Sequence, residues 1–221
     1  MSQKSVFRIC AFIMAASGLI IIFSTIYPIL SYEWEAAQKY PILISPLVDE
    51  ETGSFKFSNK DYKKASNWFE GAQTEFVSNN VEYFTLSIPK LGIEGATVAI
   101  GGEDLSQSLI QFPGTSLPGK IGNSVIFGHS ILPQYYDPKN YLAIFSTLPT
   151  LKDGDEVYVD YDGITYKYVV EDMFEVRPTD IQILEQSRSD SYLTLVTCTP
   201  PGHPLKPRRL IVRAKLVPPD I

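Results

Sequence analysis

Residues 9–30 are the feature that most restricts this chain, because 22 consecutive positions carry no charged side chain. About 20 apolar residues in a helix cross roughly 30 Å of hydrocarbon, so this run predicts a transmembrane helix. A cleavable secretory signal fits less well, since its apolar part is only about 7–15 residues long and ends in small residues. Here the run ends in Tyr27, Pro28, Ile29 and Leu30. A helix buried in a soluble core would not need so complete an absence of charge.

The residues that flank this run predict its orientation. Lys4 and Arg8 precede it, whereas Glu33, Trp34 and Glu35 follow it. The positive-inside rule then places the N-terminus in the cytoplasm and the remainder of the chain outside the cell. We therefore expect a single-pass protein of the cell membrane. Because few residues follow position 216, no second membrane helix is expected at the C-terminus.

The pattern of apolar residues in the rest of the chain changes near Tyr83. Residues 60–76 have a mixed helical periodicity of apolar positions, but the later residues form short runs of Val, Ile, Tyr and Phe separated by Gly and Pro. We expect three parts: a cytoplasmic N-terminus and anchor (1–31), a partly helical stalk (32–80) and a catalytic β-barrel (81–221). The clearest hairpin turns at Asp162-Gly163, since this dipeptide takes the positive φ values of a type I′ turn.

That hairpin would join strands at 156–161 and 164–170. Further strand candidates are residues 83–88, 97–100, 124–127, 173–176, 192–198 and 210–216. Eight or so strands in fewer than 140 residues favour a small closed barrel, which leaves no exposed sheet edge. The expected fold is mainly β, with an eight-stranded barrel and short helices after the N-terminal transmembrane helix.

The charge balance and the cysteine count exclude several functions. Lys and Arg number 19 against 25 Asp and Glu, a net charge of -6, so no basic surface for nucleic acid is expected. Cys10 falls inside the apolar run, and Cys198 is therefore a free thiol rather than half of a disulfide. A zinc site needs about four soft or imidazole ligands that the chain does not supply. We expect neither a metal nor a cofactor.

Cys198 follows the apolar stretch Leu-Thr-Leu-Val-Thr, which predicts a rigid position at the rim of the barrel. A thiol with an ordinary pKa near 8.5 is only a few per cent thiolate at neutral pH, so nucleophilic attack requires a base or a cation beside it. His129 ends another apolar strand and is the preferred base. Arg208 and Arg209 follow Cys198 by 10 and 11 positions, and a hairpin of that length returns an arginine to the thiol, where it could stabilise a developing oxyanion.

Two alternatives remain open at this stage. His203 lies five positions from Cys198 and could be the base, although three nearby prolines predict a stiff loop that leads away from the strand. Arg208 could replace Arg209, because strand ends read from sequence shift by a few positions.

Four segments together resemble the landmarks of bacterial sortases, in order and in spacing. They are Thr-Leu-Ser-Ile-Pro-Lys-Leu-Gly-Ile from 85, Gly-Asn-Ser-Val-Ile-Phe-Gly-His ending at His129, Thr-Leu-Val-Thr-Cys-Thr-Pro around Cys198, and Arg-Leu-Ile-Val-Arg from Arg209. The resemblance implies a sortase barrel with a His-Cys-Arg triad. In that triad His129 is the acid/base, Cys198 the nucleophile and Arg209 the stabiliser of the oxyanion or the substrate.

The resemblance also implies a reaction and its partners. Sortases cut surface proteins at a C-terminal signal such as Leu-Pro-x-Thr-Gly, form a thioester, and pass the acyl group to an amine of a peptidoglycan precursor or a pilin lysine. Pilus-assembling members often carry an Asp-Pro-aromatic lid and a second membrane helix, and the chain shows neither, which makes a pilin polymerase less expected. Some sortases respond to calcium, but Asp153, Asp155 and Glu156 read more simply as a polar turn.

Two other functions would use the same barrel differently. A hydrolytic cysteine peptidase would use the same cysteine and histidine but deliver the acyl group to water. A surface scaffold barrel would have no catalytic role, and its thiol would react no faster than an ordinary cysteine.

Overall fold

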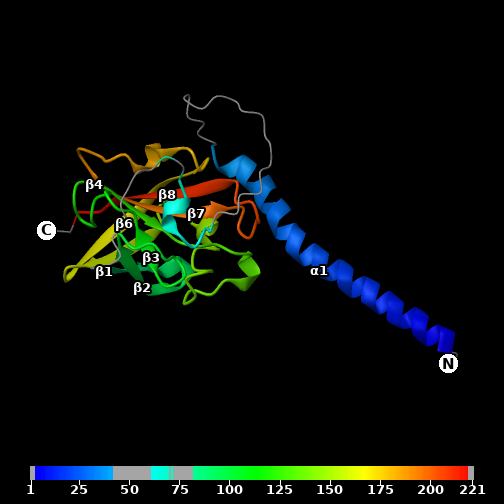
Figure 1. Ribbon diagram of the computed structural model, residues 1–221. Helices are drawn as coiled ribbons and strands as arrows, with labels where there is room; N and C mark the ends of the chain where they lie inside the picture. Colours follow the sequence, from blue (N-terminus) through cyan, green and yellow to red (C-terminus); the bar gives the residue numbers. More distant parts are fainter. Residues whose placement is uncertain (1–2, 42–60, 70, 72–81, 219–221) are drawn as a thin grey trace.

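A long helix leads into a closed β-barrel in the computed structural model, which describes residues 3–41, 61–69, 71 and 82–218. Helix α1 spans Gln3–Lys39 and projects away from the barrel (Figure 1). The barrel closes in the strand order β1-β2-β3-β4-β7-β8-β6-β5. Its strands are β1 Tyr83–Ile88, β2 Ile93–Ile100, β3 Leu109–Gln111, β4 Gly122–Phe127, β5 Glu156–Tyr161, β6 Ile164–Val176, β7 Ser191–Thr199 and β8 Arg208–Leu216.

The expected closed barrel of eight strands with short helices is confirmed, with differences in detail. The short helices are 3₁₀ turns: η1 Ala65–Asn67, η2 Pro89–Leu91, η3 Pro133–Tyr135, η4 Leu148–Thr150 and η5 Ile181–Leu184. The three-residue strand β3 was not expected from the sequence. The candidates at 164–170 and 173–176 are one strand, β6, which bends through a register shift between Val170 and Asp172.

Alternation along the strands divides the core into two clusters. Leu193 and Leu195 of β7 belong to the larger cluster, which fills the barrel interior. Val196 and Cys198 of the same strand belong to a second cluster on the outer face. Since successive side chains of a strand point to opposite faces, the proposed nucleophile lies outside the barrel and needs other segments to cover it.

The last turns of α1 pack against the barrel. Ala36 and Tyr40 are buried in the interior cluster, and Tyr32 packs on its edge, so that positions i, i+4 and i+8 form one contact face. The hydroxyl of Tyr40 donates to the carbonyl of Pro149 at 2.8 Å. The expected boundary between residues 31 and 32 therefore falls inside a continuous helix that also contains the 9–30 run. Part of this helix, Phe7–Lys39, is long and apolar enough to cross a membrane.

Residues 61–69 lie across the outer face of the barrel. Within the described part of the 60–76 stretch, the expected helical periodicity corresponds to the 3₁₀ turn η1 and flanking turns, not to an α-helix. Trp68 is fully buried and stacks on Phe127 of β4, with ring centroids 5.2 Å apart. Packing on the barrel therefore sets the conformation of this segment, and helical propensity does not.

Candidate active site

Strands β7 and β8 place Cys198 and Arg209 directly opposite each other. The two strands are antiparallel, and Cys198 pairs with Arg209 in their register. Directly opposed residues of antiparallel strands project to the same face, so both side chains lie on the outer face of the barrel. Each is only 1% exposed. Arg209 belongs to β8, which begins two residues earlier than the strand expected from residue 210.

The backbone around His129 is held against β7. Strand β4 runs parallel to β7 and pairs Phe127 with Val196. Beyond the strand, the amide of Gly128 donates to the Val196 carbonyl at 3.1 Å, and the hydroxyl of Ser130 donates to the Cys198 carbonyl at 2.7 Å. His129 lies between these two tethered residues, so the structure brings it beside the end of β7 where Cys198 lies.

Gly128 explains why the chain can place a histidine here. A Cβ at Gly128 would lie 2.4 Å from the ring of Phe145, which is itself buried. The amide of Phe145 also donates to the His129 carbonyl at 2.9 Å. Close packing against Phe145 therefore requires the glycine of the Gly128-His129 pair.

Burial, and after it the positive charges of Lys206 and Lys63, lower the pKa of His129 to about 4, although Asp61 and Asp104 act in the opposite direction. His129 is 5% exposed, and the centroid of its ring lies 5.7 Å from that of Trp68. Its Nε2 atom is buried and has no hydrogen-bond partner among the described residues. At neutral pH this histidine is uncharged, as a group that accepts a proton must be.

Arg209 is fixed by backbone carbonyls. Its Nη1 donates to Lys206 at 2.9 Å and to Arg208 at 3.1 Å, and its Nη2 donates to the carbonyl of Trp68 at 3.1 Å. The guanidinium carbon also lies 5.5 Å from the ring of Trp68 and 5.6 Å from that of Tyr62. Its Nε is buried without a partner among the residues described. Three of the five guanidinium N–H groups thus have partners, and the Nε–H and one Nη2–H are left for an incoming acceptor.

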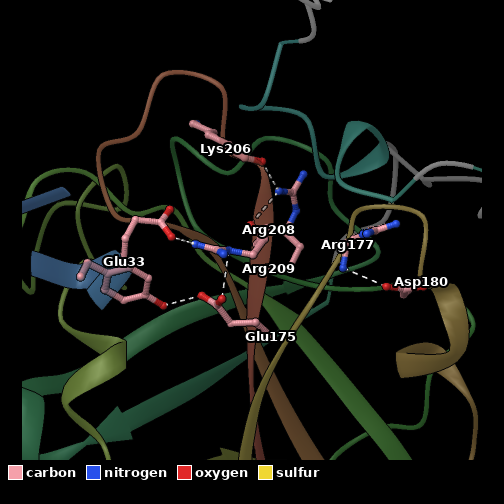
Figure 2. Close-up of polar contacts among 8 residues, drawn as sticks. Glu33, Glu175, Arg177, Asp180, Lys206, Arg208 and Arg209 are labelled. Carbon is pink, nitrogen blue, oxygen red and sulfur yellow. Dashed lines mark hydrogen bonds and ion pairs between the residues drawn. The ribbon is translucent and has the colours of Figure 1, made fainter. Parts of the chain in front are cut away.

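Arg208 points the other way and has a different set of partners (Figure 2). It forms ion pairs with Glu33 of α1 and with Glu175, the latter at 3.0 Å. Glu175 is 1% exposed and also accepts the hydroxyl of Tyr32 at 2.7 Å. Arg208 therefore joins the barrel to α1, whereas Arg209 faces the thiol side.

His203 and the acidic turn at Asp155 and Glu156 have partners of their own outside the candidate site. His203 is half-buried in the loop after β7, and its Nδ1 accepts the amide of Leu205 at 3.1 Å. Asp155 pairs with Lys90 at 2.6 Å, and Glu156 pairs with Lys167. Within the described ranges, no three His, Cys, Asp or Glu side chains group in a way that could hold a metal ion.

Sequence reasoning missed the segment that covers the site. Trp68 lies in the part of the chain that was expected to be a stalk, but its ring packs against His129 and its carbonyl accepts a hydrogen bond from Arg209. No sequence pattern marks Lys206 either, and its ammonium lies 4.7 Å from the ring centre of Tyr62. Burial lowers the pKa of Lys206, and the charge of Arg209 lowers it further, while the neighbouring Cys198 and Asp61 act in the opposite direction. No local pattern marks Trp68 as a site residue.

Known proteins resemble this chain in sequence and in the structure of the barrel. A family model described as the sortase domain matches residues 86–217. Sortase A of Streptococcus agalactiae is 27% identical over 117 residues, which cover 53% of this chain and 45% of the relative, so the match spans about half of that protein's length.

Solved structures give the same picture. A Clostridium perfringens sortase D5 transpeptidase superimposes with a TM-score of 0.52 at 27% identity, over 62% of this chain and 79% of the other. Sortase C-1 of Actinomyces oris gives a TM-score of 0.53 at 32% identity, over 61% and 73%.

Proposed function

The chain belongs to the sortase family, and from this premise we propose that it is a membrane-anchored cysteine transpeptidase. The observation that supports the proposal most strongly is the β7–β8 register, which opposes Cys198 and Arg209, together with the hydrogen bonds that hold the His129 backbone at the same strand end. The proposed roles are Cys198 as nucleophile, His129 as acid/base and Arg209 as oxyanion stabiliser.

The proposed reaction has two steps that balance at named atoms. The Cys198 thiol loses its proton to His129 Nε2, and its sulfur attacks the carbonyl carbon of the scissile peptide bond. The charge on the carbonyl oxygen is stabilised by the guanidinium of Arg209. Protonated His129 then gives its proton to the departing amine, which leaves a thioester on Cys198. A second amine attacks the thioester and forms a new amide, and the thiol regains a proton.

The covering segment imposes a condition on this reaction. Cys198 and Arg209 are almost inaccessible, and Trp68 lies against His129 and Arg209. A peptide substrate reaches the thiol only after residues 61–69 move away from the outer face of the barrel. Their departure frees Arg209 Nη2 from the Trp68 carbonyl and exposes His129 to solvent, which raises its pKa toward the ordinary value near 6.5.

The proposed substrates and location follow from the family and from α1. The acyl donor is a surface protein that bears a Leu-Pro-x-Thr-Gly-like signal, and the acceptor is an amine of a peptidoglycan precursor or a pilin. Residues 1–31 form the cytoplasmic end and anchor, residues 32–80 connect it to the barrel, and residues 81–221 form the catalytic part outside the cell. An anchored enzyme would meet both membrane-bound partners within two dimensions.

Incubation of the full chain in detergent with a sorting-signal peptide and triglycine tests the proposal by mass spectrometry. We expect a peptide–triglycine conjugate and a thioester adduct on Cys198. Cys198→Ala and His129→Ala should abolish the conjugate, and Arg209→Ala should slow it by about 10²-fold or more, the cost of losing one oxyanion donor.

Matched controls separate chemistry from folding. Cys10→Ser removes the other thiol and His203→Ala the other histidine, and each should retain the conjugate. If the products are the same with and without triglycine, the protein is a peptidase that uses water. If Cys198→Ala retains activity, the assigned nucleophile is wrong.

A further inference from the structure

The loop that follows His129 reaches down the side of α1. The side-chain amide of Gln134 in η3 donates to the backbone carbonyl of Ser24 at 3.0 Å. Pro133 lines the same cavity of about 430 Å³ as Tyr27 and Pro28 of α1. The loop therefore lies beside a stretch of helix that belongs to the uncharged 9–30 run.

The height of this contact follows from helix geometry. A span of about 20 residues that begins at Ile9 ends near Pro28. Ser24 lies four residues earlier, which is about 6 Å along the axis on the hydrocarbon side of that boundary. The tip of the loop is thus at the level where lipid headgroups meet acyl chains, if α1 crosses the membrane as proposed above.

The composition of the loop after His129 is typical of a segment at the boundary between lipid headgroups and acyl chains. Residues 130–136, Ser-Ile-Leu-Pro-Gln-Tyr-Tyr, contain no charged side chain. Tyr135 at the tip is 61% exposed, and Tyr27 of α1 is 57% exposed. Tyrosine is enriched at membrane–water interfaces, because its ring is apolar and its hydroxyl is polar.

We propose that the Leu132–Pro133–Gln134–Tyr135 tip inserts into the lipid interface as a second membrane contact beside α1. The partner is a phospholipid bilayer, and the contact continues the membrane-facing surface of the helix. Leu132 also packs on the loop after Cys198, because a Cβ at Gly202 would lie 2.6 Å from Leu132 Cγ. The loop after His129 and the loop after Cys198 therefore pack on each other. The membrane contact of the first loop then holds the proposed active site close to the membrane surface and favours substrates that are cleaved near their own membrane segment.

Tryptophan quenching by brominated phospholipids tests this inference on the full chain in liposomes. In a Trp34→Phe background, Tyr135→Trp should lose emission when acyl-brominated lipid replaces ordinary lipid. The matched control is Ile164→Trp, whose position is 52% exposed in the β5–β6 hairpin, which lies far from α1 (Figure 1). Its emission should not change. Buried Trp68 contributes a constant signal, which the background protein measures.

A third variant, Phe23→Trp within α1, separates this inference from the proposed anchor. If Phe23→Trp is quenched and Tyr135→Trp is not, the loop contact is refuted and the anchor stands. If Tyr135→Trp is also protected from aqueous iodide in that case, a protein partner or a second copy covers the tip instead of lipid. If Phe23→Trp is not quenched, the anchor and the loop contact both fail.

Discussion

Trp68→Ala tests whether residues 61–69 control access to Cys198. The indole is fully buried, stacks on Phe127 and donates its Nε1–H to the Tyr62 carbonyl at 2.8 Å. Removal of a buried tryptophan side chain costs about 3–5 kcal/mol. The burial and the stacking on Phe127 exist only while the segment covers the site, so their loss weakens the covered state relative to the open one.

The free-energy cost of removing the Trp68 side chain predicts a change in the rate at which Cys198 is labelled. If a thiol reagent reaches Cys198 only through the open state, the rate follows the open population. A change of about 3–5 kcal/mol corresponds to a rise of about 10²- to 4 × 10³-fold, since each 1.4 kcal/mol is a factor of ten. Tyr62→Ala should give a smaller rise of about tenfold, because it removes mainly the cation–π contacts of Lys206 and Arg209.

The assay is alkylation by iodoacetamide at neutral pH in a Cys10→Ser background, followed by mass spectrometry. Trp34→Ala is the matched control, because Trp34 is 70% exposed on α1 and should leave the rate unchanged. Circular dichroism verifies that the barrel remains folded. A labelling rate for Trp68→Ala within about twofold of the parent would contradict the reasoning, since the contacts of this tryptophan would then not limit access.

Three further predictions concern stability and loop packing. Burial holds the pKa of His129 at about 4, against 6.5 for an exposed histidine, so the unfolded chain binds the proton more readily. The free energy of unfolding should therefore fall by about 3 kcal/mol as the pH drops from about 6.5 to about 4, and denaturant titration of His129→Gln should show a smaller fall. Glu175→Gln leaves Arg208 without its buried carboxylate and should cost about 3 kcal/mol of unfolding free energy, whereas Glu156→Gln, at a surface ion pair, should leave the unfolding free energy nearly unchanged. Gly202→Ala should lower transpeptidation and stability more than Gly154→Ala, because both glycines have positive φ but only the first meets a neighbour, Leu132; equal effects would show that backbone strain alone matters.

Much of the barrel follows from sequence because its strands alternate and its turns carry their own signals. The limits of β1 and the hairpin at Asp162-Gly163 were predicted correctly. Strand β3 was missed because three residues are too few to show a period of two. The division of β6 was wrong because its bulge interrupts the alternation without ending the strand.

The candidate site was only partly accessible to sequence reasoning. Cys198 and His129 each end an apolar strand, and the strand pairing brings both ends together. The contact of Trp68 with them depends on how a distant segment packs on the outer face of the barrel, and no local periodicity encodes this. The sequence likewise predicted only a rim position for the thiol, and its burial depends on the segment that packs over it.

The pair Arg208-Arg209 shows how one strand can serve two tasks. Because neighbouring side chains of β8 point to opposite faces, Arg209 opposes Cys198 while Arg208 reaches Glu33 of α1 and the buried Glu175. The start of β8 is thus held from one side by the helix proposed to cross the membrane, and on the other side it carries the proposed oxyanion stabiliser. A displacement of the last turns of α1 would move the backbone of Arg208, and Arg209 would move with it relative to the thiol. Attachment to α1 is therefore linked directly to the geometry of the proposed active site, and Arg208→Ala should lower transfer in liposomes as well as the stability of the barrel.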